Sequence, residues 1–339
     1  MIAFCWSGFP QYAARCVRAF VDSTSERVVV VATRPNVPIK GMEDVCGCEV
    51  IWIDRDETRR IEEIAGEIPR LVFSTGWHVP AFNRYCGAVR ECGGKAVCLC
   101  DNNKEGTFKE FLKGFRFRLF KRNRYDGFVV PGKSGRKLLE GYGVPAELIE
   151  EGMYCADSSL FKDGAALSER PRRIMYVGQF SERKNVLRLS EAFGAIENKR
   201  DWELHMFGCG PVKLPVMEGL VVHPFMQPEG IAAEYRKARI FCLASLEEHW
   251  GVVVHEAALS GCALCLSNKV GAADDFLSDK NGICFDPYDI NDIAAKLSAL
   301  MEFDETSLSA AHSQSLELSK NASKDKFVSA VQRFSMGAK

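Results

Sequence analysis

Short apolar, β-branched runs alternate with longer segments of helical periodicity along most of the chain, and this alternation constrains the fold most strongly. Strands that are connected through helices form a parallel sheet with helices packed on its faces. The runs are continuously apolar, as expected of strands that are buried on both faces. In the first half we predict strands at 1–6, 27–32, 48–53, 70–74, 95–100 and 127–131. Helices are predicted between them near 10–23, 58–68, 80–92, 106–124 and 132–142.

The second half repeats the scheme after a polar stretch at 158–173. Strands are predicted there at 173–177, 202–207, 220–222, 239–244, 262–266 and 282–285, and helices near 185–198, 228–237, 250–260, 272–278 and 289–302. A chain of 339 residues is long enough for two domains that each bury a core. We therefore predict two doubly wound, Rossmann-like α/β domains, 1–160 and 170–320, facing each other across a cleft. Ligands of such sheets bind beyond the carboxyl ends of the strands.

Composition sets the cellular context and excludes some partners. The formal net charge of -1 gives no reason to expect binding to nucleic acid. Many of the 14 cysteines lie in apolar runs such as 240–243 and 263–266, which is typical of buried thiols in a reducing cytosol. The chain opens on a short apolar run without an export leader, and no run approaches the roughly 18 apolar residues that span a bilayer. We expect a cytoplasmic protein, with peripheral contact at the inner membrane face as the only membrane association left open.

The segment 245–261 carries the most chemical information. The predicted strand 239–244 leads into a polar loop, Gly251 opens a helix and Gly261 can close it. Glu248 precedes this helix and Glu256 lies eight positions later, at most about 12 Å away at the helical rise. Two carboxylates at this spacing suit hydroxyl groups at opposite ends of one elongated ligand, and the helix N-terminus between them suits a diphosphate. A nucleotide sugar has that layout.

These residues resemble the motif of two glutamates separated by seven residues in the large retaining glycosyltransferase family of GT-B fold (family 4, group 1). Other segments resemble further parts of the same family, and together they span about 125 to 302. They are Tyr142–Pro145 through Asp157 and Phe161, Tyr176–Phe180 with Arg183–Asn185, Phe207–Pro211, Val270–Ala272, Asn281–Gly282 and Asp286–Pro287.

The resemblance implies a GT-B enzyme that moves a sugar from a nucleotide-diphosphate sugar to a hydroxyl acceptor. It implies retention of the anomeric configuration and neither a metal nor another cofactor. The donor domain would be 170–320 and the acceptor domain 1–160, to which a last helix at about 322–339 returns. A glycan or a lipid-linked molecule would be the acceptor, as in bacterial polysaccharide or glycolipid assembly.

Residue by residue, the resemblance implies that Glu248 contacts hydroxyls of the transferred sugar and that Glu256 contacts the ribose. Lys184, together with Arg183, would neutralise the diphosphate leaving group, because positive charge there stabilises the transition state. The family usually has arginine after the glycine of the first loop of the donor domain, where this chain has Gln179. The neutral amide weakens leaving-group stabilisation unless Arg183 compensates.

The resemblance also implies a set of donor-binding residues. Gln179 and Glu256 belong to this set. Its other members are Gly8, Gly178, Gly208, Gly210, Phe225, Met226, His249, Trp250 and Gly251.

Two polar residues in the first half are candidates for the acceptor side. Asp101 ends the apolar run 96–100 and would accept a proton or a hydrogen bond from the attacking hydroxyl. It would alternatively cap a helix. His78, which follows Gly76 and Trp77, is the second candidate, with a structural histidine as the alternative.

Several competing interpretations are open at this point. The letters of 127–134 fit a phosphate-binding P-loop, but its middle residues favour a strand over a cradle. Asp54 and Asp56 resemble a metal site without further ligands. Six cysteines of the first half also suggest zinc, but no two of them have the Cys-x-x-Cys spacing of a structural site, and they are Cys46, Cys48, Cys86, Cys92, Cys98 and Cys100. A nucleotide-sugar epimerase, or a catalytically silent sugar-nucleotide binding protein, would share the fold, and Gln179 favours the silent protein.

The segment 107–124 is strongly basic and rich in phenylalanine. It has seven lysine or arginine residues against the single acid Glu110. We expect an apolar stripe at helical spacing to pack on the sheet, and its members are Phe108, Phe111, Leu112, Phe115 and Leu119. The excess positive charge suits an anionic membrane surface or an anionic acceptor.

Overall fold

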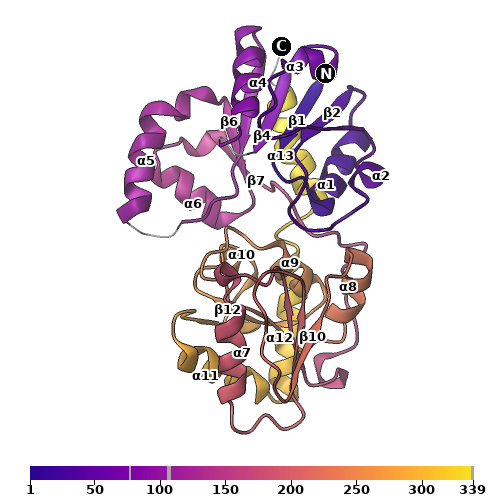
Figure 1. The fold of residues 1–339 in the computed structure, drawn as a ribbon, viewed down its shortest axis with the longest axis vertical. Coiled ribbons are helices and arrows are strands. Elements are labelled where there is room, and N and C mark those ends of the chain that lie inside the picture. The colour runs from indigo at the N-terminus through magenta and orange to yellow at the C-terminus, as the bar shows by residue number, and fades with distance from the viewer. Residues whose placement is uncertain (76–77, 105–107, 337–339) are drawn as a thin grey trace. The chain divides into compact units, whose positions relative to one another are not determined.

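A computed structural model describes residues 1–75, 78–104 and 108–336 and divides the chain into two compact units. Unit 1 consists of Met1–Cys155 together with Ala322–Lys339, and unit 2 consists of Ala156–Asn321. Each unit is built on one parallel sheet (Figure 1). The predicted fold class of two doubly wound α/β sheets is confirmed.

Unit 1 contains a seven-stranded sheet in the order β3-β2-β1-β4-β5-β6-β7. Its strands are β1 (Ile2–Trp6), β2 (Val28–Ala32), β3 (Glu49–Trp52), β4 (Leu71–Thr75), β5 (Lys95–Leu99), β6 (Gly127–Val130) and β7 (Ile149–Glu151). Its helices are α1 (Gln11–Asp22), α2 (Met42–Cys46), α3 (Ile61–Ala65), α4 (Pro80–Glu91), α5 (Phe108–Phe120), η1 (Arg122–Arg124), α6 (Lys133–Gly141), η2 (Ala146–Leu148) and α13 (Lys324–Met336). Strand β7 was not predicted, because two of its three residues are glutamates.

The last helix, α13, belongs to unit 1 although most of unit 1 precedes it by more than a hundred residues. In Figure 1 it lies beside β1 and α1. The ring of Phe327 stacks on Phe4 of β1 at 6.1 Å between centroids. Gly127 at the start of β6 has no room for a side chain, since a Cβ atom there would lie 2.1 Å from the ring of Phe334. The first glycine of the P-loop-like segment is therefore explained by helix packing.

Unit 2 contains a six-stranded sheet in the order β10-β9-β8-β11-β12-β13. Its strands are β8 (Arg173–Val177), β9 (Glu203–Phe207), β10 (Leu220–His223), β11 (Ile240–Leu243), β12 (Ala263–Ser267) and β13 (Gly282–Phe285). Its helices are η3 (Leu167–Glu169), η4 (Glu182–Lys184), α7 (Val186–Ala195), α8 (Pro228–Tyr235), α9 (Val252–Leu259), α10 (Ala273–Phe276), α11 (Ile290–Met301) and α12 (Glu305–Ser319).

The polar stretch 158–173 packs into unit 2 through a buried arginine. Arg170 donates from Nε to the Ala165 carbonyl at 2.7 Å, and from its terminal nitrogens to the carbonyls of Ala238 at 2.9 Å and Ser260 at 2.8 Å. A guanidinium with these partners satisfies backbone groups that would otherwise be orphaned in the interior. The stretch is therefore part of the packed unit.

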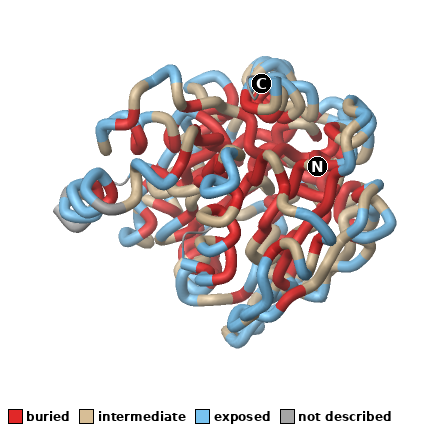
Figure 2. The backbone as a smooth tube through the Cα atoms, turned by 90° about the horizontal axis from the view of Figure 1, so that it is seen from above, coloured by how far each residue is buried: buried red, intermediate tan, exposed pale blue. Residues whose placement is uncertain are grey.

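Burial follows the sheets, as Figure 2 shows by colour. The residues of β1, β2, β4, β6, β11 and β12 are all buried. Continuous burial on both faces explains why these strands are apolar at successive positions rather than at alternate ones.

Helix α5 differs from expectation. Leu112, Phe115 and Leu119 are 53%, 62% and 58% exposed, so the prediction that this stripe packs on the sheet is wrong for them. The buried aromatic residue is Phe117, which packs on Phe128 of β6 at 5.8 Å between ring centroids. The helix is thus rotated relative to the predicted face. The side chains of Phe108 and Phe111 lie outside the described part of the structure.

Candidate active site

In unit 2 the strand order changes direction between β8 and β11, and ligands of such sheets bind at the carboxyl ends of these strands. From β8 the chain continues to β9 and β10 on one side of the sheet, whereas β11 is followed by β12 and β13 on the other. β8 and β11 are paired neighbours, so the loops that follow them begin at this switch point, where sheets of this kind bind ligands. Lys184 comes from the β8 loop and Glu248 from the β11 loop.

Lys184 and Glu248 form an ion pair between Nζ and Oε2. Their side chains are only 12% and 11% exposed. The hydroxyl of Ser245 donates to the same Oε2 atom at 3.1 Å. Burial alone would raise the pKa of Glu248, but the charge and hydrogen bond of Lys184, with help from Arg183 and Ser245, outweigh it and lower the pKa. The site therefore holds an ionised carboxylate beside a cation.

Backbone bonds attach the loop of Glu248 to the loop that follows β8. The Leu246 N–H donates to the Arg183 carbonyl at 2.8 Å, and the Arg183 guanidinium donates to the Glu247 carbonyl at 2.7 Å. Arg183 is otherwise exposed. Its side chain thus braces the Glu248 loop and adds a second positive charge near the pair.

The loop that follows β12 holds Glu248 from the other side. The Glu248 N–H donates to the Lys269 carbonyl at 3.2 Å, and its carbonyl accepts from the Gly271 N–H at 3.0 Å. These bonds form an isolated parallel bridge between Glu248 and Val270. The carboxylate is therefore positioned by three loops at the carboxyl edge of one sheet.

Gly251 connects this loop to α9. It has φ 94°, in the left-handed region that favours glycine, and a Cβ atom there would lie 3.1 Å from Cγ of Glu248. The helix begins at Val252, directly after it. Glycine at this position lets the helix start close behind the acid.

Glu256 lies in α9 and is partly buried. The hydroxyl of Tyr235, from the end of α8, donates to its Oε2 atom at 2.9 Å. Burial raises the pKa of Glu256 to about 7, and the Tyr235 hydrogen bond limits this rise. Glu248 is thus ionised at neutral pH, whereas Glu256 is poised near half protonation.

The glycines of the β8 and β9 loops are explained by close contact between the loops. A Cβ atom at Gly208 would lie 1.9 Å from the Gly178 carbonyl oxygen, and one at Gly210 would lie 2.2 Å from that of Phe180. The Gly178 N–H donates to the Phe207 carbonyl at 3.0 Å. Backbone packing is therefore sufficient to require glycine at positions 208 and 210.

Trp250 and His249 differ in their surroundings. The side chain of Trp250 is 1% exposed, packs on the ring of Phe276 at 5.4 Å between centroids and approaches Asp275 with its indole N–H at 3.3 Å. The Trp250 side chain therefore lies in the core of unit 2, and not on a surface open to a donor. His249 is partly exposed and contacts the Glu247 carboxylate at 3.1 Å.

Three further predicted donor residues lie at the same carboxyl edge. Gln179 is exposed, and its carbonyl accepts from the buried Tyr176 hydroxyl at 3.0 Å. Phe225 and Met226 are half-buried in the loop between β10 and α8.

The candidates from the first half all lie in unit 1. Gly8 follows β1 with φ 65°, and its N–H donates to the hydroxyl of Thr33 at 2.8 Å, so its amide serves the loop itself. Asp101 is half-buried in the loop after β5. His78 is exposed in the turn before α4, while Gly76 and Trp77 lie outside the described residues.

Three residues contribute to the site without having been predicted as site residues. Ser245 and Tyr235 bond the two glutamates, and Asn185 donates from Nδ2 to the Pro287 carbonyl at 2.8 Å, which links the β8 and β13 loops. Ser245 could have been found as a hydroxyl on the same loop. Nothing in the sequence identifies Tyr235 as a site residue, because its partner Glu256 is 21 positions away.

Within 1–75, 78–104 and 108–336, no cluster of three or more histidine, cysteine or acidic side chains is placed to hold a metal ion. Asp54 and Asp56 are exposed after β3. Among helices in the same ranges, none has the length and apolar composition to cross a membrane.

Solved structures with the same architecture define the class of fold. The complex of Anabaena HepE with UDP superposes with a TM-score of 0.74, at 12% identity and with 99% of each chain covered. A glycosyltransferase from Rickettsia africae gives a TM-score of 0.74 at 13% identity, covering 99% of this chain and 98% of that one. The fold is GT-B.

Residues 158–322, which lie almost entirely in unit 2, match the family "Glycosyl transferases group 1", so this part of the chain is a glycosyltransferase domain of that family. The D-inositol 3-phosphate glycosyltransferase of Corynebacterium kroppenstedtii is 27% identical over 212 residues, which cover 53% of this chain and 46% of that protein. The chain thus spans about half the length of this curated relative. The family match covers the whole Lys184–Glu248 site.

Proposed function

We propose that the protein transfers a sugar from a nucleotide-diphosphate sugar to a hydroxyl acceptor with retention of the anomeric configuration. The observation that carries this proposal is the buried Lys184–Glu248 pair at the switch point of unit 2. UDP is the first nucleotide to test, because HepE has been crystallised with UDP and with UDP-glucose.

Lys184 and Glu248 would bind different parts of the donor. The ammonium group of Lys184 carries three N–H donors, so it can hold Glu248 with one and offer another to a diphosphate oxygen. Glu248, ionised, accepts hydrogen bonds from hydroxyls of the transferred sugar. Arg183 adds positive charge where Gln179 has none.

In the proposed reaction the acceptor oxygen attacks the anomeric carbon on the face from which the diphosphate departs. The bond between that carbon and the phosphate oxygen breaks, and the diphosphate leaves with the electron pair. The departing phosphate takes the proton of the acceptor hydroxyl. The cations of the β8 loop lower the barrier by stabilising charge that develops on the leaving group.

Glu256 is proposed to hold the ribose through its hydroxyls. Its place in α9, eight residues after Glu248, lets the nucleotide and the sugar contact the two ends of one helix segment. Its hydrogen bond to Tyr235 fixes the side-chain direction.

The test compares Glu248→Gln with Glu247→Gln, an exposed glutamate one residue away on the same loop. Transfer and hydrolysis of UDP-sugars would be measured in both variants. We expect Glu248→Gln and Lys184→Met each to lower kcat by about a hundredfold to a thousandfold, and Glu247→Gln to stay within about twofold. Full activity in Glu248→Gln would refute the proposal.

Misfolding must be separated from loss of chemistry, because breaking a buried ion pair leaves one charge without its partner. The double variant Glu248→Gln with Lys184→Met removes both charges. We expect it to regain most of the lost thermal stability while staying inactive.

A catalytically silent binding protein is the second candidate, and the exposed amide of Gln179 favours it. It predicts UDP binding without turnover over a panel of acceptors. An epimerase would instead convert the donor into an isomer without acceptor. Incubation of the donor alone, followed by product analysis, distinguishes these outcomes from slow hydrolysis by a transferase.

We further propose that α5 contacts an anionic membrane at the cytoplasmic face, in polysaccharide or glycolipid assembly. Leu112, Phe115 and Leu119 form an exposed apolar stripe on a helix that also carries several cations. An apolar stripe flanked by cations is typical of interfacial helices. The double variant of Phe115 and Leu119 to serine should reduce sedimentation with phosphatidylglycerol vesicles, whereas Leu187→Ser, an exposed leucine of α7, should not. Equal vesicle binding by all three proteins would refute this contact.

A further inference from the structure

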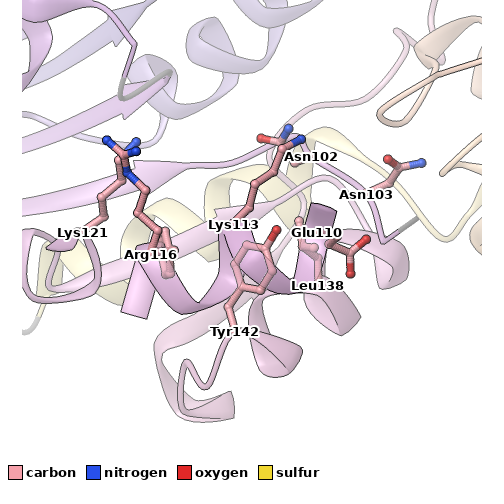
Figure 3. Close-up of a pocket in the computed structure, with 9 residues that line it drawn as sticks. Asn102, Asn103, Glu110, Lys113, Arg116, Lys121, Leu138 and Tyr142 are labelled. Carbon is pink, nitrogen blue, oxygen red and sulfur yellow. The ribbon is translucent and has the colours of Figure 1, made fainter. Parts of the chain in front are cut away.

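A cavity lies in unit 1 between Asn102 and Asn103, which follow β5, and helices α5 and α6. Its volume is about 260 Å³. Three cations, Lys113, Arg116 and Lys121, line it, together with the amides of Asn102 and Asn103 and the hydroxyl of Tyr142 (Figure 3). Glu110 is the one acid of the lining, so the formal charge around the cavity is positive.

One face of α5 lines the cavity. Glu110, Lys113 and Phe117 are spaced by three and four residues, so they share the helix face that lines the cavity. Phe115 and Leu119 lie on the opposite, exposed face. The helix thus lines the cavity with charged groups beside the buried Phe117, and it also exposes apolar side chains to solvent.

Packing against α6 fixes this orientation. A Cβ atom at Gly114 would lie 2.5 Å from the ring of Tyr142, so the two elements touch closely there. The rings of Phe117 and Tyr142 lie 5.5 Å apart between centroids. These contacts form the apolar floor of the cavity and hold the α5 cations at its rim.

The cations are close enough to repel one another. Burial lowers the pKa of Lys121, and the charges of Arg116 and Arg124 lower it further. Figure 3 shows the nitrogen atoms of Arg116 and Lys121 on the same side of the cavity, with Lys113 directed to the side where Asn102 lies. A multiply charged anion would relieve this repulsion and accept hydrogen bonds from both the cations and the amides.

We propose that this cavity binds a phosphate group carried by the acceptor, so that the enzyme acts on a phosphorylated acceptor. This inference rests on the proposed transfer to a hydroxyl acceptor. A phosphate monoester carries three terminal oxygens and nearly two negative charges at neutral pH, which matches two or three converging cations. The volume is slightly below the range of about 300–1,000 Å³ that is typical of complete small-molecule sites. It therefore suits a phosphate and the group next to it, while the rest of the acceptor lies outside.

The experiment measures binding of glycerol 1-phosphate to the full chain by calorimetry. Arg116→Gln is compared with Arg118→Gln, since Arg118 is an exposed arginine of the same helix that does not line the cavity. We expect saturable binding, a loss of about tenfold or more in Arg116→Gln, a similar loss in Lys113→Gln, and a change within about twofold in Arg118→Gln. No saturable binding by the wild type, or equal losses in the two arginine variants, overturns the proposal.

The phosphate can come from a soluble acceptor or from a lipid headgroup, and the two sources are separated by competition. Phosphatidic acid carries its phosphate as a monoester. If vesicles that contain it displace glycerol 1-phosphate from the wild type, the cavity accepts lipid phosphate; if they do not, it accepts the soluble ester. Either result supports the cavity as a phosphate site provided that Arg116→Gln abolishes it. Vesicle binding that is lost only in the serine variants of Phe115 and Leu119 would count against lipid phosphate in the cavity.

UDP binding gives an independent control. Arg116→Gln should leave the affinity for UDP unchanged, because Arg116 belongs to unit 1 whereas Lys184, Glu248 and Glu256 belong to unit 2. A Glu248→Gln variant that is inactive but still binds glycerol 1-phosphate would support both proposals separately. Failure of the donor assignment would leave the phosphate result intact.

Discussion

The two glutamates of α9 and its preceding loop should titrate at very different pH values, and Glu256→Gln makes this testable. In the folded protein Glu256 has a pKa of about 7, because burial disfavours its charged form. In the unfolded chain it should return to its ordinary value of 4.5. Between these two values the folded state binds more protons than the unfolded state does, so stability must fall as the pH rises.

The difference between pKa values of about 7 and 4.5 corresponds to about 3 kcal/mol of unfolding free energy. The contribution of Glu256 is fully present below pH 4.5 and is lost as the pH rises through about 7. Glutamine does not titrate. The unfolding free energy of Glu256→Gln should therefore rise relative to that of the wild type by about 3 kcal/mol between pH 4.5 and pH 8. Groups that titrate in both proteins, such as the buried His255, cancel in this comparison.

Urea unfolding of both proteins over this pH range measures the effect, and infrared difference spectra of the carboxyl C=O stretch report the pKa of Glu256 directly. Tyr235→Phe should raise that pKa further, because it removes the hydrogen bond that favours the ionised form. Parallel stability curves for wild type and Glu256→Gln, or an infrared pKa near 4.5, would refute the reasoning.

Three further substitutions test the packing of the two units. Gly208→Ala should lower the unfolding free energy by several kcal/mol, on the order of 3, in thermal unfolding, because its Cβ atom meets a backbone oxygen at 1.9 Å. Gly87→Ala in α4, where a Cβ atom would meet nothing within 4 Å, should instead raise it by about 0.5–1 kcal/mol. His255→Leu should cost about 1–3 kcal/mol for each of two buried backbone groups, the Ala156 N–H and the Ser319 carbonyl, that lose their ring-nitrogen partners at 3.0 Å and 2.9 Å. Unchanged midpoints in Gly208→Ala or His255→Leu would contradict these assignments.

Most strands could be predicted because they are buried on both faces and are therefore apolar throughout. Elements without a continuous apolar run could not be predicted from the pattern of apolar residues. Strand β7 has a single buried residue, Ile149, and joins the sheet only by pairing with β6. Helix α12 begins with an Asp304 cap but carries five serines and no clear apolar stripe, so its sequence resembles a loop.

The orientation of α5 was mispredicted for a related reason. Helical spacing identifies two faces, one through Phe117 and one through Phe115, and both contain aromatic side chains. Apolar periodicity assigns the larger face to the sheet. The structure places Phe117 inward because Gly114, beside it, permits contact with Tyr142. That contact depends on a residue beyond the helix and is invisible in the local pattern.

In the candidate site, too, residues that are close in the sequence could be predicted, whereas contacts between distant segments could not. The loop containing Ser245, Glu248 and Gly251 is contiguous, so its residues could be recognised together. The sequence could not show whether the predicted glycines and Trp250 contact a ligand or another part of the protein. The same residue type is found in both situations. Distances to neighbouring backbone atoms show that contact between loops requires glycine at Gly208 and Gly210.

The buried Lys184–Glu248 pair has a physical consequence for how the donor is bound. Removing two charges from water costs several kcal/mol per ion, and their attraction offsets this only partly, so such a pair adds little net stability. Here Glu248 is also bonded by Ser245 and fixed through its own backbone to the loop after β12. Lys184 and Glu248 are therefore already removed from water in the folded protein, before any donor binds. A diphosphate that approaches Lys184 meets a cation whose position is already set, and this is the condition under which electrostatic stabilisation of a leaving group is most effective.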